Sequence, residues 1–119
     1  MTPFGAKVRA YRAAQKLTLK AMAADLQISE AYLSSLEHGY RGRPSEALVV
    51  QICEYFNLIW DDYEEMHRLA ALSHPKVTVD TSGLTPNHTE LANTLAERIR
   101  DLSDQDAAAI LARLRGDLF

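Results

Sequence analysis

The sequence predicts an all-α protein, and two patterns support this prediction. Apolar residues recur three and four positions apart through most of the chain, which is the period of a helix with one buried face. A Ser or Thr that suits a helix N-cap stands before most of these apolar stripes. The spacing predicts a five-helix domain over residues 1–72, a linker or short strand over 73–86, and an extension of about two helices over 87–119.

The chain begins with a helical stripe, because Phe4, Val8 and Tyr11 lie at positions i, i+4 and i+7. Thr18 is a suitable N-cap for a second helix that runs to about Leu26. These two elements are rich in alanine, which allows helices to pack closely.

A third helix is expected from its N-cap, Ser29, to about Glu37. Gly39 follows in the position that favours a left-handed C-cap. The second and third helices should be held together by an apolar grid of Leu17, Met22, Ala23, Leu26, Ile28, Leu33 and Leu36.

A fourth helix is expected to open at Pro44 and Ser45 and to end near Asn57. Its apolar face comprises Leu48, Val49, Ile52 and Phe56. A fifth helix is expected from Asp61 and Asp62, whose carboxylates suit the positive end of the helix dipole. Its apolar positions are Met66, Leu69 and Leu72.

The pattern changes at Ser73. The following segment contains two prolines, a glycine and the alternation of Val77 and Val79, so it is either a linker or a short strand, and a short extended segment is favoured. Thr85 and Pro86 mark a new helix, and Ser103 caps a last one. Two helices of about a dozen residues form no core of their own, so their stripes should pack on the first domain or on a second copy of the chain. These stripes comprise Leu91, Leu95, Ile99, Leu102, Ala107, Ile110, Leu111 and Leu114.

Charge is distributed unevenly along the chain. The net charge is −3, but residues 1–44 carry seven Lys and Arg against three Asp and Glu, whereas residues 45–72 carry one against six. A local basic patch is what matters for binding phosphate groups. The acidic total therefore does not exclude a nucleic-acid partner for the N-terminal part.

Several classes of protein are excluded by composition. No apolar run approaches the roughly 20 residues that a membrane helix needs, and the N-terminus interleaves basic with apolar residues instead of forming a signal peptide. No membrane partner and a cytoplasmic location are therefore expected. Cys53 is the single cysteine, and we expect it to be a small core residue, with redox sensing as the alternative.

A larger set of residues is spaced as in a known family. The set comprises Arg12, Leu17, Thr18, Met22, Ala23, Leu33, Ser34, Leu36, Glu37, Gly39, Arg41, Arg43 and Pro44. Over roughly residues 4–72 the chain thereby resembles the helix-turn-helix family of the Cro and phage-repressor type, often called the Xre family. The resemblance implies a DNA-binding transcriptional regulator whose third helix reads the major groove.

Two positions refine this resemblance. Leu19 stands where the family often has a Gln that helps to hold phosphate, so that role should pass to Thr18, Lys20 or backbone amides. Arg12 and Glu37 match a family pair that joins the first helix to the end of the recognition helix, and we interpret them as a structural ion pair.

The recognition helix should enter the groove with its N-terminus first, so its first residues are the candidate base readers. Glu30 could accept from the amino group of cytosine, or it could only stabilise the helix dipole. Tyr32 could contact a phosphate or only cover the helix, and Arg41 and Arg43 could contact phosphates or form a solvated loop. The full set of candidate DNA-binding residues is Thr18, Lys20, Ser29, Glu30, Ala31, Tyr32, Ser34, Ser35, Arg41 and Arg43.

Other chemistry has weak support. The four histidines lack metal-site spacing and have no cysteine companions, and Asp61 with Glu65 is more typical of a solvated helix face than of a catalytic pair. No phosphate-binding glycine loop or nucleophile motif is present. We therefore expect no cofactor, no metal and no enzymatic activity.

The expected function is regulation of transcription, with repression favoured, by a homodimer that reads an inverted repeat in double-stranded DNA. The expected dimerisation residues are Val77, Val79, Leu91, Leu95, Ile99, Leu102, Ile110, Leu111 and Leu114. The alternative is an antitoxin-like regulator whose C-terminal or acidic helices hold a protein partner. A small-molecule sensor is a more distant alternative, because the 47 residues after the first domain leave little room for a ligand pocket.

Overall fold

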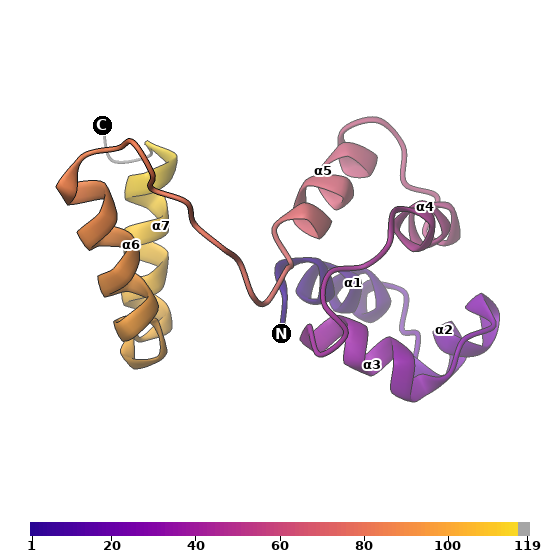
Figure 1. The fold of residues 1–119 in the computed structure, drawn as a ribbon. Helices are drawn as coiled ribbons and strands as arrows, with labels where there is room; N and C mark the ends of the chain where they lie inside the picture. Colours follow the sequence, from indigo (N-terminus) through magenta and orange to yellow (C-terminus); the bar gives the residue numbers. More distant parts are fainter. Residues whose placement is uncertain (117–119) are drawn as a thin grey trace. The chain divides into compact units, whose positions relative to one another are not determined.

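Seven α-helices and one short 3₁₀ helix form the described part of the chain, residues 1–116, in a computed structural model (Figure 1). The predicted all-α class is confirmed, and no strand occurs in residues 1–116. The chain divides into two compact units, Met1–Val77 and a second that begins at Thr78. The last three residues of the expected extension over 87–119 lie outside the described residues.

The first unit contains five helices: α1 (Pro3–Ala14), α2 (Leu19–Leu26), α3 (Glu30–His38), α4 (Glu46–Tyr55) and α5 (Trp60–Ala71). The side chains of Thr18, Ser29 and Ser45 accept hydrogen bonds from backbone N–H groups at the starts of α2, α3 and α4, as predicted. Gly39 ends α3 in the left-handed conformation with φ 83°. Helix α5 begins one residue earlier than expected, at Trp60.

The core lies between these helices and contains most of the predicted apolar grid. Leu17 and Ile28 are partly buried against it, whereas the remaining grid residues are fully buried. Cys53 is also fully buried, which confirms its role as a small core residue, and this burial raises the pKa of its thiol. The buried apolar residues are Phe4, Val8, Met22, Ala23, Leu26, Leu33, Leu36, Leu48, Val49, Ile52, Cys53, Phe56, Met66 and Ala70.

A buried serine joins the two ends of this unit. The hydroxyl of Ser73, just after α5, accepts a hydrogen bond from the backbone N–H of Phe4 at 3.0 Å and donates to the carbonyl of Leu69 at 2.6 Å. Ser73 is 2% exposed. The first residue of the expected linker is therefore fixed to the start of α1.

The second unit contains α6 (Pro86–Arg98), the 3₁₀ helix η1 (Ile99–Asp101) and α7 (Asp104–Arg115). Thr85 and His88 form a capping box at the start of α6, and Ser103 caps α7. Residues 73–85 form no strand, so the extended segment that was favoured there does not pair as a sheet. No residue of α6 or α7 within 86–115 is buried, which confirms that the two helices form no core of their own.

Candidate nucleic-acid interface

The connection between α2 and α3 is a short turn with a left-handed residue. Gln27 ends α2 with φ 59° and ψ 41°, and the backbone N–H of Ile28 donates to the carbonyl of Ala23 at 3.0 Å. The Ile28 side chain packs against the core, while Ser29 begins the next helix. The turn thus fixes the angle between α2 and α3 through its backbone hydrogen bond and through the packing of the Ile28 side chain.

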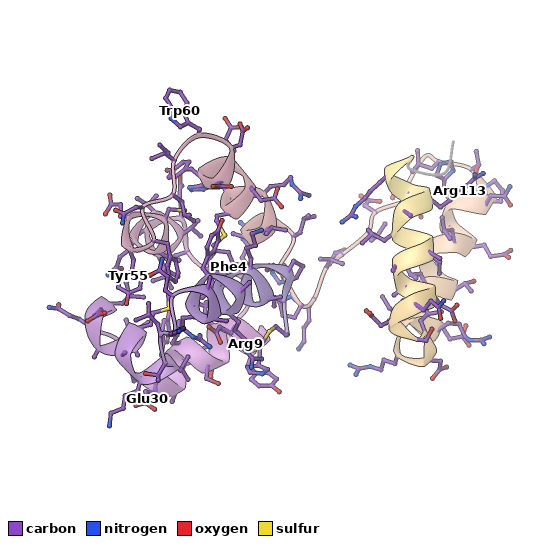
Figure 2. All side chains as sticks on the ribbon, turned by 180° about the vertical axis from the view of Figure 1, so that it is seen from behind. Phe4, Arg9, Glu30, Tyr55, Trp60 and Arg113 are labelled. Carbon is purple, nitrogen blue, oxygen red and sulfur yellow. The ribbon has the colours of Figure 1, made fainter. Side chains whose placement is uncertain are left out.

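Helix α3 buries one face and exposes its first turn. Leu33, Leu36 and Glu37 face the core, whereas Glu30 and Ala31 are exposed. Glu30 projects outward at one end of the unit (Figure 2). The three other candidates on this helix, Tyr32, Ser34 and Ser35, are partly buried.

The cap residue of α3 keeps a free donor. Ser29 is exposed, and its Oγ accepts from the N–H of Tyr32 at 3.0 Å. Because accepting this bond leaves the hydroxyl hydrogen available, Ser29 can cap the helix and still donate to an outside acceptor.

At the start of α2, Thr18 caps in the same way, accepting from the N–H of Ala21 at 3.0 Å, and Lys20 is exposed beside it. Leu19 is partly buried against the core. The side chain of Leu19 thus packs against the core and offers no polar group to a phosphate.

Helix α1 holds the C-terminal half of α3 at very short range. A Cβ atom added to Gly5 would lie 2.0 Å from the carbonyl oxygen of Glu37, so only glycine fits here. The backbone N–H of Thr2 donates to the same carbonyl at 3.0 Å. The position of α3 is therefore set by backbone contacts as well as by side-chain packing.

Arg12 and Glu37 form the expected ion pair between α1 and α3. Their side chains are 11% and 4% exposed. Burial raises the pKa of Glu37, and the guanidinium of Arg12 offsets part of this shift by favouring the carboxylate. A buried pair of this kind fixes geometry more than it adds stability.

The two arginines of the loop after α3 lie in different surroundings. The Arg41 guanidinium lies over the ring of Tyr32, 5.5 Å from its centroid, which is a cation–π contact. Arg43 instead lines a cavity of about 270 Å³ with Pro44, Glu46 and His67, between the loop, α4 and α5. The sequence predicted the same role for both arginines, but in the structure only Arg41 contacts the recognition helix.

Two aromatic residues beside this loop were missed by the sequence reasoning. The rings of His38 and Tyr40 are stacked with centroids 5.8 Å apart, and Tyr40 is 83% exposed. Their position in the sequence directly before Arg41 and Arg43 was the signal that could have indicated them. Both rings are exposed directly before the basic loop.

A shallow groove of about 450 Å³ runs beside the N-terminus of α3. Ser29 and Tyr32 line one side, and Ser45, Ala47 and Gln51 line the other, at the start of α4. Two helix N-termini therefore border one groove, and their free N–H groups favour anions.

The second unit exposes an apolar surface. Among the expected dimerisation residues, Leu95 and Leu102 are partly buried, and the others are exposed. Two grooves, of about 310 and 230 Å³, lie between α6 and α7, and Leu95, Leu102, Ile110 and Leu114 line both. Val77 and Val79 are 74% and 64% exposed.

No group of three or more His, Cys, Asp or Glu side chains within residues 1–116 is arranged to hold a metal ion. None of the helices in this range is both long enough and apolar enough to cross a membrane.

The family model described as a helix-turn-helix domain matches residues 3–69, which cover α1 to α4 and most of α5. This is more than half of the chain, and the chain belongs to this helix-turn-helix family.

A more particular similarity is to a Bacillus subtilis (strain 168) protein named the uncharacterized HTH-type transcriptional regulator RghRB. The identity is 35% over 74 residues, which are 62% of this chain and 50% of the relative. The matched region thus spans about half the length of this curated relative. No solved structure matches the chain.

Proposed function

We propose that the protein is a transcriptional regulator that binds double-stranded DNA through α3. Membership of the helix-turn-helix family and the similarity to a protein named as a transcriptional regulator support this role. The observation that carries the proposal is the exposed first turn of α3, on a helix whose other end is fixed to α1 by Gly5 and Arg12. A helix whose end is held rigidly in this way can fit the major groove in one defined orientation.

Base recognition in this proposal falls to the exposed and half-buried residues of α3. Glu30 would accept from the cytosine amino group, and the Ala31 methyl would touch a thymine methyl. The hydroxyls of Ser29, Ser34 and Ser35 would serve several bases or the flanking phosphates.

The phosphate contacts would come from the groups that surround α3. Thr18 and Lys20 lie at the start of α2, and Arg41 is held over Tyr32 on the other side of the helix. Arg43 would reach the backbone from beside α4. The backbone amides at the starts of α2 and α4 would share this role, because Leu19 offers no polar group.

We infer that the protein binds an inverted repeat as a homodimer through its second unit. One recognition helix reads too few base pairs for specificity in a genome, and a two-fold dimer doubles that number. The exposed leucines and isoleucines of α6 and α7 are the surface for the second copy, aided by Val77 and Val79. Repression then follows most simply, because a bound dimer excludes other proteins from its site. DNA binding would place the protein in the cytoplasm, on the nucleoid. The protein would then be a regulator of the Xre type.

The decisive experiment is selection of bound duplexes from a random pool with the full chain. The expected result is a two-fold symmetric motif with half-sites about one helical turn apart. Enrichment of no motif would contradict sequence-specific binding, and an asymmetric motif would contradict the homodimer.

Variants then assign the roles of single residues on the selected duplex. Glu30→Gln should change the preference at one base pair in each half-site, and an unchanged preference at every position would refute its reading role. Replacing Arg41 and Arg43 by Ala should reduce the slope of log affinity against log salt by about 4, because the dimer would lose two phosphate contacts in each monomer and each contact contributes about one unit. An unchanged slope would refute their phosphate contacts.

A further inference from the structure

The connection between α4 and α5 exposes an unusual surface that the DNA-binding proposal does not use. Trp60 is 81% exposed and Ile59 is 64% exposed. Asp61 and Asp62 follow directly and are both exposed, and Glu64 lies one helical turn after Trp60. We call Ile59, Trp60, Asp61 and Asp62 the tryptophan patch.

The backbone at this patch has two unfavourable local features. Trp60 adopts a left-handed conformation with φ 55°, which is unfavourable for a bulky side chain. The N-cap of α5 is Ile59, which makes no side-chain capping bond, whereas Thr or Ser caps the other six α-helices of residues 1–116. The local structure is thus strained and uncapped, and it presents a tryptophan to solvent.

The charge of the patch selects its partner. Phosphate groups would be repelled by Asp61 and Asp62, so nucleic acid does not fit this surface. An isologous contact with a second copy would bring the same carboxylates together across a two-fold axis, which is also repulsive. A protein surface with an apolar pocket and a rim of Lys or Arg matches both the tryptophan and the acidic residues.

We propose that the tryptophan patch docks a basic protein partner, with Trp60 as the anchor in an apolar pocket. Trp60 and Glu30 lie at opposite ends of the first unit (Figure 2), so this partner and DNA would bind to separate faces of the same domain. Tryptophan is among the residues that most often dominate the energy of protein interfaces. The proposal goes beyond DNA binding and does not depend on it.

The test uses short random peptides displayed on phage, selected on the immobilised full chain after depletion on the Trp60→Ala variant. The expected peptides combine apolar residues with two or more Lys or Arg. Trp60 is the single tryptophan of the sequence, so synthetic copies of these peptides should shift its emission to shorter wavelength. Trp60→Ala should weaken binding by about tenfold or more.

Two further variants make the result specific. Asp61→Asn combined with Asp62→Asn should weaken binding and reduce its salt dependence, because it keeps Trp60 and removes the charge. Tyr40→Ala removes another highly exposed aromatic ring, outside the patch, and should leave peptide affinity unchanged. The thermal melting of each variant shows that it is folded.

Three results would overturn the proposal. The first is that no peptide prefers the original chain to Trp60→Ala. The second is that the enriched peptides carry no basic residues. The third is self-association in sedimentation equilibrium that is lost in Trp60→Ala, which would assign the patch to a second copy. The assay contains no DNA, so its failure leaves the DNA-binding proposal standing, and failure to select a duplex leaves the patch standing.

Discussion

Glu37 joins two helices through three contacts, one from its side chain and two from its backbone. Its carboxylate pairs with Arg12, its carbonyl accepts from the N–H of Thr2, and its backbone lies against Gly5. All three join α1 to the end of α3, opposite the turn that would read DNA. Single residues therefore control the orientation of α3 from outside the candidate interface.

Replacing Glu37 by Ala should lower the free energy of unfolding by about 3 kcal/mol, because it leaves the largely buried guanidinium of Arg12 without a partner. DNA affinity should fall with it. Equilibrium urea unfolding measures the first effect and a duplex titration the second. Glu65→Ala is the matched control, since its pair with Arg68 is exposed and should contribute less than about 1 kcal/mol. Normal melting of Glu37→Ala would contradict a structural role for the pair.

Gly5→Ala tests the close approach of α1 to α3. By helix propensity alone this change should stabilise the protein by about 1 kcal/mol. The added Cβ would collide with the carbonyl of Glu37, and we expect a loss of about 3 kcal/mol instead. The sign of the change in thermal unfolding is therefore decisive, and a stabilised variant would contradict the contact.

At the scale of helices and turns, α2 and α4 are joined by polar contacts at the rim of the core. The hydroxyl of Tyr55 donates to Asp25 at 2.6 Å, and the amide of Gln51 donates to the carbonyl of Leu26 at 3.3 Å. The hydrogen bond to Asp25 is the main cause that raises the pKa of Tyr55 to about 12. This pair makes the contact between two helices dependent on pH.

The hydrogen bond of Tyr55 should be lost in alkaline solution. Tyr55 has an ordinary pKa of 10.0 in the unfolded chain and a value of about 12 in the fold, so the folded state holds this proton more tightly between these values. Its contribution to stability should be complete below pH 10 and should disappear as the pH rises through about 12. Urea unfolding of the original chain and of Tyr55→Phe should show a difference that shrinks over this range. A difference that is constant with pH would contradict the contact.

Helices were predictable from the sequence because their signals are local. Thr18, Ser29 and Gly39 stand at the ends where their backbone preferences place them. Contacts between distant residues were less accessible, because spacing along the chain does not reveal which surfaces meet. The close approach of α1 to α3 at Gly5 and the different surroundings of Arg41 and Arg43 are examples. Trp60 was missed for another reason, since its left-handed backbone contradicts the preference of its residue type.

For the whole molecule, the main contrast is between a unit with a buried core and a unit without one. The first unit buries the residues that its helices share, whereas α6 and α7 leave Leu91, Ile99 and Leu114 exposed. A helix pair of this kind gains stability from a partner surface. We therefore assign folding to the first unit and proposed assembly to the second.

Ending the chain after Val77 should give a folded monomer with weaker operator binding. The cut keeps Ser73, whose hydroxyl holds the start of α1, and so separates loss of assembly from loss of folding. Sedimentation equilibrium should show a monomer for the truncated chain and a dimer for the full one. Leu114→Glu in the full chain should have the same effect, because it places a charge on the exposed apolar surface. A truncated chain that remains dimeric would assign dimerisation to the first unit.

The serine that fixes the end of α5 also defines where the tether between the units begins. Asp80 accepts from the backbone N–H of Ser82, and Thr81 is hydrogen-bonded to Thr89 of α6, so only the stretch from His74 to Val79 separates the two anchored regions. Fully extended, this stretch spans about 20 Å. In a dimer, a domain bound to one half-site would confine its twin to a small volume, at an effective concentration in the millimolar range. The affinity for the operator would then depend on the number of base pairs between the half-sites, because the two tethers limit the distance that the two domains can span. Base pairs inserted beyond that distance would reduce the affinity of the dimer to that of a single domain.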